Sequence, residues 1–362
     1  MWKSVQYLAT TKIEVVPENT QIFMVDGRVP GWQPKPYDYC WNHHRPKGAM
    51  TQVDEMPFPS DDTPLLDTYA IESLYLAGTQ GISGRERVPQ TIVTTQVDAD
   101  ACCSAAWLQL SGSVLNSVKN AVSNSDRLRA IAYDCDHLYV PDELSHLSSF
   151  AAQAVATLKQ SSNSLAKSMG LPDDQKIWSD EQRIQYGSAV FKYGTEWFIN
   201  ASLDKQLWPG ESGEATEYWQ QVEMDKQMLY ESGRISVLNK VAICDMRGLN
   251  YRPDVRSFVK AIREFILPKN DLRPETLLIR DHGINGHRYT LSSLPNHPKY
   301  LELDYTHKVI KKLSEAERKK TTKDNYDCEW GGRQQVAGSA WNSPSLLKPE
   351  EVVDIVIANS NI

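Results

Sequence analysis

The sequence lacks long apolar runs. No hydrophobic stretch approaches the roughly 20 residues that a helix needs to cross a bilayer, and the first residues, MWKSVQYLATTK, do not contain the apolar segment of a secretory signal. We therefore expect a cytoplasmic protein with no membrane partner. Internal repeats and long low-complexity segments are also absent. At 362 residues, 41% of them hydrophobic, the chain can bury a sizeable core and is expected to form about two domains.

An excess of basic residues is missing too. The formal net charge is −7 at pH 7, whereas a protein that coats long duplexes needs a broad basic surface. Short nucleotides are not excluded, because a local cleft can be basic and a carboxylate-rich metal site adds negative charge that its cations offset. The charge therefore argues against a general nucleic-acid coat and leaves small anionic substrates open.

Pairs of the type C-x-x-C do not occur among the cysteines. Their absence argues against a zinc knuckle and against the disulfide framework of a small secreted protein. Cys102, Cys103 and Cys135 lie in acid-rich segments and are expected to be small packing residues. The alternative for them is thiolate ligation of a soft metal, although the surrounding acids favour a hard one. The six cysteines are Cys40, Cys102, Cys103, Cys135, Cys244 and Cys328.

The most informative segment that is present is TIVTTQVDADACCSAAW, residues 91–107. A β-branched strand leads into Asp98 and Asp100, and the small residues after them allow a helix to pack closely behind. Such a cluster of carboxylate oxygens suits a hard divalent cation. The alternative for either aspartate alone is an ordinary helix N-cap, which satisfies backbone N–H groups without a metal.

Two further apolar segments close on acids. TQIFMVDG ends at Asp26, and LRAIAYDCDH ends at Asp134 and Asp136, so three predicted strands finish in carboxylates. After Asp26, the segment YCWNHHRPKG contains the adjacent His43 and His44. A lone histidine pair is more often unliganded than liganded, but beside three strands that end in acids a metal-binding role is favoured.

These residues resemble the DHH phosphoesterases. VDADACCSA is similar to the family's first motif, D-x-D-A-x-x-S-A, and NHHRPKG is similar to its Asp-His-His motif with Asn42 in place of the aspartate. Near the other end of the chain, CEWGGRQQVAGSAWNSPSLLKPEEVVDIV, from Cys328, is similar to the G-G-G-H-x-x-A-A-G signature of the substrate-binding DHHA1 domain. Each motif is degenerate, but their occurrence in one chain is more specific than any one of them.

The chain departs from the family in motif order and at two residues. In the family the D-x-D motif comes before the histidine motif, whereas here Asp26 and the histidines come first; a permuted first domain would account for this, because a metal site depends on which residues meet in space. Asn42 can coordinate through oxygen but carries no charge, so a neighbour such as Asp38 could take its place. Arg333 replaces the DHHA1 histidine, keeps a positive group for phosphate and adds bidentate geometry.

The resemblance implies a metal-dependent phosphohydrolase of the phosphodiesterase or exonuclease type. Two divalent cations, manganese or alternatively magnesium, would activate a water and polarise a phosphoryl oxygen. The implied substrate is a short single-stranded oligonucleotide, a dinucleotide or a small nucleoside phosphate. His44 could instead act as an acid toward the leaving group, and Asp136 with His137 could support or replace Asp134.

The resemblance also assigns a role to particular residues of this sequence. The implied metal ligands are Asp26, His43, His44, Asp98, Asp100, Asp134 and Asp136. The implied catalytic residues are His44, Asp98 and Asp100. The implied substrate-binding residues are Gly331, Gly332 and Arg333; the two glycines could simply make a turn, but before Arg333 they are expected to expose backbone N–H groups to a phosphate. His287 and Arg288 are further substrate-binding candidates from the sequence itself, because they lie near a glycine-containing turn in DHGINGHRYTLSS, for which an ordinary hairpin with polar flanks is the alternative.

The predicted fold class is α/β. We expect a doubly wound, DHH-like metal-binding domain over residues 1–145, a helical connector over 146–232 and a smaller DHHA1-like α/β substrate-binding domain over 233–362. In the first domain the pattern predicts strands at 12–25 and 90–97 and helices at 68–76 and 115–122. In the connector, the aromatic stripe that includes Tyr186 and Trp197 is expected to be packing core. After Gly233, strand-like runs precede a helix near 309–320.

Two other functions stay open. A degenerate, noncatalytic DHH-like module that binds a nucleotide or a protein partner is favoured by Asn42 and by the altered motif order, whereas the many retained acids favour the enzyme. A two-metal phosphoanhydride hydrolase is the second alternative, and the glycine–arginine segment argues weakly for an organic substrate instead. The oligomeric state is left open.

Overall fold

The computed structural model describes residues 5–45, 48–76, 78, 89–172, 175–213, 215–269, 273–283, 286–295, 304–322, 327–340 and 343–360. The chain forms two compact units. The N-terminal unit comprises Met1–His43 and Ala49–Thr216, and the C-terminal unit comprises His44–Gly48 and Glu217–Ile362. This division differs from the three predicted ranges, because most of the segment expected to be a connector belongs to the N-terminal unit. None of the helices in these described ranges is long and apolar enough to cross a membrane.

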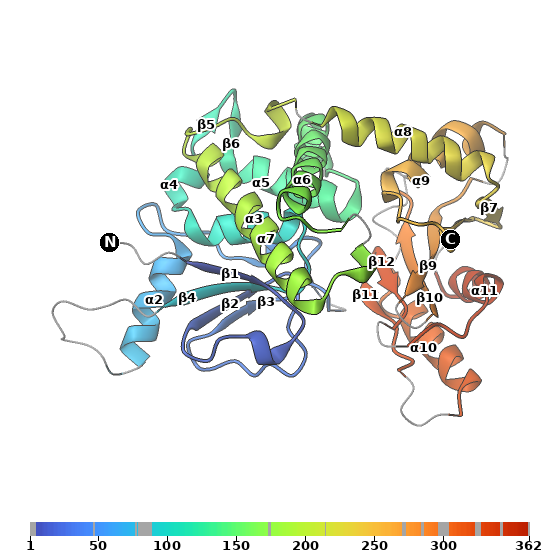
Figure 1. The fold of residues 1–362 in the computed structure, drawn as a ribbon, viewed down its shortest axis with the longest axis horizontal. Helices are drawn as coiled ribbons and strands as arrows, with labels where there is room; N and C mark the ends of the chain where they lie inside the picture. Colours follow the sequence, from blue (N-terminus) through green and yellow to red (C-terminus); the bar gives the residue numbers. More distant parts are fainter. Residues whose placement is uncertain are drawn as a thin grey trace. The chain divides into compact units, whose positions relative to one another are not determined.

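The N-terminal unit is built on a four-stranded parallel sheet in the order β1-β4-β2-β3. The strands are β1 (Gln6–Ala9), β2 (Gln21–Val25), β3 (Tyr39–Trp41) and β4 (Gln90–Thr94). β2 and β4 are the two inner strands, and their apolar residues are buried on both sides of the sheet, as expected for parallel strands. Parallel pairing brings the carboxyl ends of all four strands to one edge (Figure 1).

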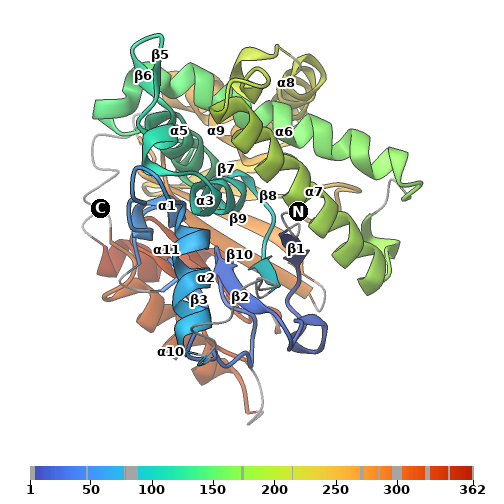
Figure 2. The same cartoon turned by 90° about the vertical axis from the view of Figure 1, so that its left-hand side faces the viewer.

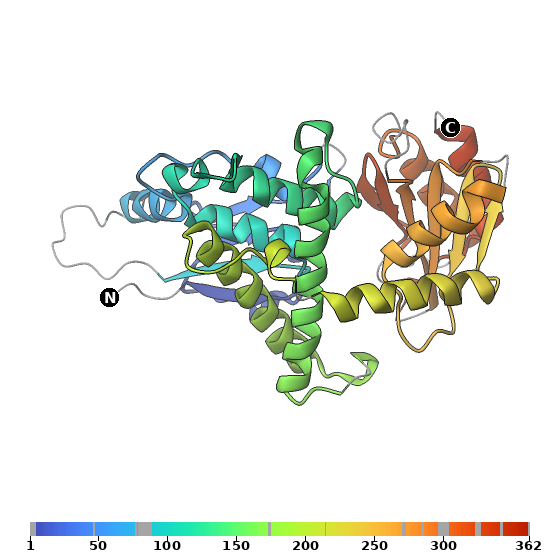
Figure 3. The ribbon, with the colours of Figure 1, turned by 90° about the horizontal axis from the view of Figure 1, so that it is seen from above.

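Helices pack on one face of this sheet. The largest apolar cluster joins Phe23, Val25 and Ile92 of the sheet to residues of the helices α2 (Leu65–Leu76), α3 (Ala99–Gln109), α5 (Asn124–His137), α6 (Ser148–Ser168) and α7 (Asp180–Ser202). α6 and α7 are the longest helices of the unit, drawn in green in Figure 3. Of the aromatic stripe predicted to be packing core in α7, Phe198 is fully buried and Tyr186 and Trp197 are partly buried, whereas Tyr193 is exposed. The packing role therefore holds for only part of the stripe.

The opposite face of the sheet is covered differently. Ile22, Met24 and Val93 pack there against Val16 and Trp32, which lie in connecting segments. The predicted doubly wound arrangement would place helices on both faces. Among the described residues of this unit, the clusters place helices on one face only, so the fold is α/β with a parallel sheet, but the doubly wound detail is not observed.

Several elements of this unit differ from the sequence-based predictions. Residues 12–25 were expected to be one strand, but only Gln21–Val25 pairs in the sheet, and Ile13–Val15 forms a 3-10 turn. The helix predicted at 115–122 is instead the end of α4 (Gly112–Leu115) followed by a hairpin of β5 (Val118–Lys119) and β6 (Val122–Ser123). A left-handed backbone at Asn120 and Ala121 forms the turn and prevents a continuous helix.

The prediction of a strand before Asp134 is also wrong. Residues 124–137 form α5, in which the Ser123 hydroxyl accepts the Asp126 N–H as an N-cap. The run RAIAY does not show the strict apolar–polar alternation of a half-buried strand. Short apolar runs of this kind fit a strand or a helix equally well. The cap at Ser123 and the packing of α5 against α3 and α6 decide for the helix. The remaining short helices of this unit are α1 (Gln52–Glu55), Asp142–Leu147, Gln175–Ile177 and Pro209–Glu211.

The C-terminal unit contains a six-stranded mixed sheet in the order β11-β12-β10-β9-β8-β7. The strands are β7 (Ile235–Leu238), β8 (Val241–Asp245), β9 (Thr276–Gly283), β10 (Gly286–Ser293), β11 (Gly331–Arg333) and β12 (Val336–Gly338). Of these strand pairs, β8–β9 is parallel and the others are antiparallel. The long β9–β10 hairpin, drawn in orange in Figure 2, forms the middle of the sheet.

Helices complete the C-terminal unit. Val309 and Leu313 of α10 (Val309–Lys320) and Val352 of α11 (Pro349–Asn359) join a cluster with the buried Tyr289 and Leu291 of β10. The other helices are α8 (Thr216–Glu231) and α9 (Val255–Ala261), which continues through a π turn at Ile262–Ile266 and a 3-10 turn at Leu267–Lys269. The predicted strands after Gly233 and the helix near 309–320 are confirmed.

Candidate metal centre

Acidic and histidine side chains gather at the carboxyl edge of the parallel sheet. Asp26 directly follows β2, and His43 lies two residues after β3. Asp98 and Asp100 follow β4, although a loop of three residues separates the strand from Asp98, and Asp100 already lies in the first turn of α3. Asp136 comes from the last turn of α5. Four elements far apart in sequence thus contribute to one site.

His43 lies between three carboxylates. Its Nε2 atom is 3.0 Å from Asp26 Oδ1, 3.5 Å from Asp100 Oδ2 and 3.7 Å from Asp136 Oδ2. The side chains of His43, Asp26 and Asp100 are at most 1% exposed, and that of Asp136 is 9% exposed. One imidazole can offset at most one of three carboxylate charges, so ionising all three acids together would leave an excess of negative charge in a buried site.

Asp100 is the most deeply buried acid of the group. Its Oδ2 atom accepts the backbone N–H of Gln52 at 3.0 Å, whereas Oδ1 is buried without a hydrogen-bond partner among the described residues. Burial raises the pKa of the Asp100 carboxyl well above its usual range, and the neighbouring Asp136, Asp26 and Asp98 raise it further. A buried carboxylate oxygen without a donor is rare in native proteins. A bound cation would satisfy this oxygen and reverse the shift.

Asp98 combines both roles that the sequence left open for it. Its Oδ1 atom accepts the backbone N–H of Ala101 at 2.9 Å and so caps α3. At the same time Asp98 belongs to a group with Cys135 and Asp136 whose potential ligand atoms all lie within 4.8 Å of one another. The other oxygen, Oδ2, accepts a long hydrogen bond from the Gln96 side chain at 3.4 Å, and its second lone pair could still serve the site.

The electrostatics of the two helix ends differ. Asp98 and Asp100 lie at the N-terminus of α3, where the helix dipole stabilises negative charge. Asp136 lies in the last turn of α5, where the dipole is unfavourable for an acid. Another acid, Asp134, is buried just before it on the same helix. The end of α5 therefore gains from a nearby cation.

The cysteines of this region are buried or partly buried. Cys102 and Cys103 lie on α3, and burial raises the pKa of both thiols. Cys102 contacts α7, where a Cβ added to Gly194 would lie 2.8 Å from its Sγ atom, which fits the expected packing role. Cys135 differs, because its Sγ atom lies with the carboxylates of Asp98 and Asp136. Burial raises the pKa of this thiol as well, which disfavours a thiolate unless a metal binds.

Three predicted site residues are placed differently from the expectation. Asp134 is buried on α5 but is outside the groups around His43 and Asp98. Asp136 takes the position that was expected for Asp134. His137 directs Nε2 to the backbone oxygen of Met50. Asp38 cannot replace Asn42, because its carboxylate accepts the N–H groups of Ile22 and Lys35 at the amino end of the sheet.

His44 follows His43 directly and is exposed. One of its ring nitrogens lies within 4.8 Å of ligand atoms of Asp26 and His43. Asn42, immediately before His43, is partly buried. The histidine pair therefore divides into a buried member inside the carboxylate group and an exposed member beside it.

The turn after β2 allows the ends of β2 and β4 to approach each other closely. Asp26 has a left-handed backbone with φ of 52°, and Gly27 follows with φ of 113°; such a conformation is uncommon outside glycine and often occurs at functional sites. A Cβ atom added to Gly27 would lie 2.1 Å from Thr95 Oγ1. Thr95 donates a hydrogen bond to the backbone oxygen of Asp26 at 3.1 Å. This contact links the end of β4 to the end of β2.

Two residues that sequence reasoning missed support the site. Gln52 donates its backbone N–H to Asp100, and its side-chain amide is fully buried with no hydrogen bond from either terminal atom to the described part of the chain. Thr95 fixes the turn at Asp26. Neither position has a sequence signal, since the contacts depend on segments that are 48 and 69 residues apart.

The predicted substrate residues lie in the C-terminal unit. Gly331, Gly332 and Arg333 form the edge strand β11, paired with β12, rather than a free turn. Arg333 is buried, and Gly331 is exposed. Arg288 lies on β10 opposite Asp281; burial and a nearby arginine lower its pKa. The side chain of His287 is outside the described residues.

The donor set fits a hard divalent cation. Carboxylate oxygens are typical ligands of magnesium and manganese, and an imidazole nitrogen beside them disfavours magnesium relative to manganese. Asp100 Oδ1 is a buried oxygen that still lacks a partner within the described ranges. The groups Asp26–His43–His44, His43–Asp100–Asp136 and Asp98–Cys135–Asp136 overlap through shared residues. Such an arrangement can hold more than one cation.

Comparisons with known proteins add little. No protein-family model matches the chain, and no curated protein matches its sequence. Among solved structures, the pGpG-specific phosphodiesterase PggH from Vibrio cholerae is similar over 56% of this chain and 55% of its own, with a TM-score of 0.26 and 9% sequence identity. The chain thus matches about half the length of that protein.

Proposed function

We propose that the chain is a metal-dependent phosphoesterase whose centre contains Asp26, His43, Asp98, Asp100 and Asp136. One observation carries the proposal: three nearly buried carboxylates surround a fully buried imidazole, and Asp100 Oδ1 has no hydrogen-bond donor among the described residues. A structural ion-pair network would be expected to satisfy its buried oxygens with N–H or O–H donors. Cations would satisfy them here.

The residues would hold the cations from two sides. Asp26, with His43, binds from the ends of β2 and β3, and Asp98 and Asp136 bind from the helix termini of α3 and α5. Asp100 lies between them, because it contacts His43 and is electrostatically coupled to Asp136, Asp26 and Asp98. Divalent cations at this site, manganese or magnesium, would supply a Lewis acid for a phosphoryl oxygen and lower the pKa of a water.

The remaining residues position groups for this chemistry. The Gln52 N–H fixes one oxygen of Asp100, and Thr95 fixes the Asp26 turn, so both ligands are oriented before substrate binds. His44 is exposed beside the site and is our candidate acid for the leaving oxygen. No nucleophilic side chain is required, because water attacks the phosphorus.

We infer a short nucleotide as the substrate, in the form of an oligonucleotide, a dinucleotide or a small nucleoside phosphate. The resemblance of NHHRPKG and VDADACCSA to the DHH motifs supports this class. Gly331, Gly332, Arg333 and Arg288 of the C-terminal unit are our candidates for phosphate contacts, and the C-terminal unit is our candidate for a DHHA1-like substrate domain. Asn42, which replaces a charged ligand of the family, favours the noncatalytic nucleotide-binding module as the second candidate.

The test is hydrolysis of bis(p-nitrophenyl) phosphate and of a panel of dinucleotides by the full chain with added manganese. We expect turnover that EDTA abolishes and that Asp100→Asn lowers at least about 100-fold, since even indirect disturbance of metal ligands costs 10- to 100-fold. Asp204→Asn is the matched control, because Asp204 forms an exposed ion pair with Lys119. A wild-type protein that binds manganese but hydrolyses none of these esters would favour the noncatalytic module.

A further inference from the structure

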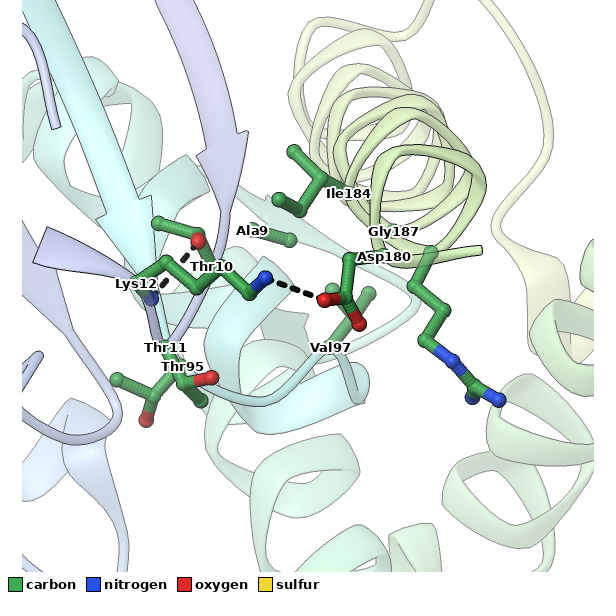
Figure 4. Close-up of a pocket in the computed structure, with 10 residues that line it drawn as sticks. Ala9, Thr10, Thr11, Lys12, Thr95, Val97, Asp180, Ile184 and Gly187 are labelled. Atoms are coloured by element: carbon green, nitrogen blue, oxygen red, sulfur yellow. Dashed lines mark hydrogen bonds and ion pairs between the residues drawn. The ribbon is translucent and has the colours of Figure 1, made fainter. Parts of the chain in front are cut away.

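A second feature lies along the same sheet edge in the N-terminal unit. A cavity of about 220 Å³ opens where β1 and β4 end and α7 begins. Figure 4 shows side chains from these three places around it. The cavity is lined by Ala9, Thr10, Thr11, Lys12, Thr95, Val97, Asp180, Arg183, Ile184 and Gly187.

The lining has an apolar part and a polar part. Ala9, Val97 and Ile184 supply aliphatic surface, against which the flat ring of a ligand can pack. The polar part contains the ion pair between Lys12 Nζ and Asp180 Oδ2, drawn as a dashed line in Figure 4. The two side chains are 39% and 66% exposed. An ion pair this exposed contributes little to stability, so a ligand can replace it at small cost.

The cavity adjoins the candidate metal centre through the chain itself. Thr95 lines the cavity and donates its hydrogen bond to the backbone oxygen of Asp26. Val97, also in the lining, directly precedes Asp98. In the strand order β1-β4-β2-β3 the cavity occupies the β1–β4 end of the edge, and Asp26 and His43 occupy the β2–β3 end. A nucleotide with its phosphate at the metal centre can therefore reach the cavity with its base.

We propose that this cavity binds the base of the substrate nucleotide and selects guanine. Asp180 presents carboxylate oxygens, which accept two parallel N–H donors, and Lys12 beside it presents a donor. Guanine carries the complementary edge, with its N1–H and 2-amino group as donors next to the O6 acceptor. Adenine and cytosine lack the paired donors, and uracil has one N–H between two carbonyls. This inference rests on the proposed phosphoesterase function.

A second phosphate group of the substrate, besides the one at the metal centre, fits the cavity less well than a base does. The carboxylate of Asp180 would repel a phosphate, and Arg183 donates to the backbone oxygen of Gln175. Threonine hydroxyls at positions 10, 11 and 95 donate or accept equally well. Lys12 and Arg183 outnumber Asp180 by one positive charge, but Lys12 is paired with Asp180 and Arg183 donates to Gln175. A ring with both donors and acceptors can use the Asp180 carboxylate as an acceptor, which a phosphate cannot do.

The experiment measures binding of GMP, IMP, AMP and UMP to the full chain by calorimetry with calcium in place of manganese, so that the carboxylates of the metal centre do not repel the phosphate. We expect GMP to bind at least about tenfold more tightly than AMP, with IMP between them because it lacks the 2-amino donor. Asp180→Asn should reduce the preference for GMP over AMP to about twofold or less, because the amide offers a single acceptor oxygen. Asp204→Asn, which alters another exposed lysine–aspartate pair, should keep the wild-type preference.

Equal binding of all four nucleotides, undetectable binding of GMP, or an unchanged preference in Asp180→Asn would each overturn the proposal. Thermal melting of Asp180→Asn reports folding, and we expect a melting temperature near wild type because Ser179 rather than Asp180 caps α7. Hydrolysis of bis(p-nitrophenyl) phosphate, which has no base, tests the phosphoesterase separately. Manganese-dependent turnover of that ester without a preference for GMP would reject the guanine cavity alone. A preference for GMP without any turnover of the ester would reject the phosphoesterase alone.

Discussion

His43 Nε2 and Asp26 Oδ1 lie 3.0 Å apart in the interior of the N-terminal unit, although 17 residues separate them in the chain. Parallel pairing of β2 and β3 brings their carboxyl ends together and produces this contact. Asp100 and Asp136 complete the group from two helices. The pair is thus the meeting point of strand and helix ends on which the proposed metal centre depends.

The two roles of Asp98 can be separated by two substitutions. Asp98→Asn removes the charge but keeps an oxygen for the α3 cap, since asparagine is as good an N-cap as aspartate. We expect hydrolysis to fall at least about 100-fold with little change in melting temperature. Asp98→Ala should lose the same activity and a further ~1 kcal/mol of stability. Steady-state rates and thermal melting of both variants decide this, and full activity in Asp98→Asn would leave the residue as a cap only.

The buried Asp100 makes stability depend on pH in the metal-free protein. Its pKa is raised by burial and by neighbouring acids, so the folded state favours the protonated form more than the unfolded state does. Ionised Asp100 therefore lowers the free energy of unfolding at neutral pH. This cost of ionisation is lost as the pH falls through the raised pKa and the carboxyl becomes protonated. In EDTA, Asp100→Asn should melt at a higher temperature than wild type at about pH 7.5, and the difference should shrink on acidification.

In manganese, wild type should melt at a higher temperature than Asp100→Asn, the opposite of the order expected in EDTA. A cation that binds only the folded state stabilises it by about 2.7 kcal/mol at a concentration about 100 times its dissociation constant. Wild type should gain melting temperature in manganese, and Asp100→Asn should gain much less because it offers one charged ligand fewer. If both proteins respond equally to manganese and to EDTA, Asp100 is not a ligand.

The two glycines of β11 should respond differently to alanine. Gly332 has φ of 147°, and a Cβ atom there would lie 2.2 Å from the backbone oxygen of Val336. Gly331 has no described heavy atom within 4 Å of such a Cβ. Gly332→Ala should therefore destabilise the C-terminal unit by at least about 1–3 kcal/mol, whereas Gly331→Ala should stay near wild type. Urea unfolding of the two variants measures the difference, and equal stability would contradict the described hairpin.

Arg333 tests the proposed substrate role of β11. Arg333→Ala should lower catalytic efficiency about tenfold or more, since a charge-assisted contact contributes about 1.5–3 kcal/mol. Arg333→Lys should recover only part of this, because lysine keeps the charge but loses the planar fork. Arg333 is buried, so melting temperatures and manganese content are measured alongside. Wild-type kinetics in a folded Arg333→Ala protein would show that β11 is a structural edge strand.

Sequence patterns indicated the α/β class and most of the residues of the proposed metal centre. Asp26 and the Asp98–Asp100 pair could be found because apolar β-branched runs precede them, and parallel strands bring the residues at their carboxyl ends to one edge. His43 could be found beside His44, but no local pattern indicates that one is buried and the other exposed. That difference depends on the packing of the segment after β3 against Asp26 and Asp100.

Other features were decided by tertiary structure alone. The residues before Asp134 fit a strand or a helix, and packing of α5 against α3 and α6 selected the helix, which in turn placed Asp136 rather than Asp134 beside His43. The contacts of Gln52 with Asp100 and of Thr95 with Asp26 join distant segments. Local patterns specify which residues a strand or helix delivers to its end, but only the packed chain specifies which ends meet, because that depends on contacts between residues far apart in sequence.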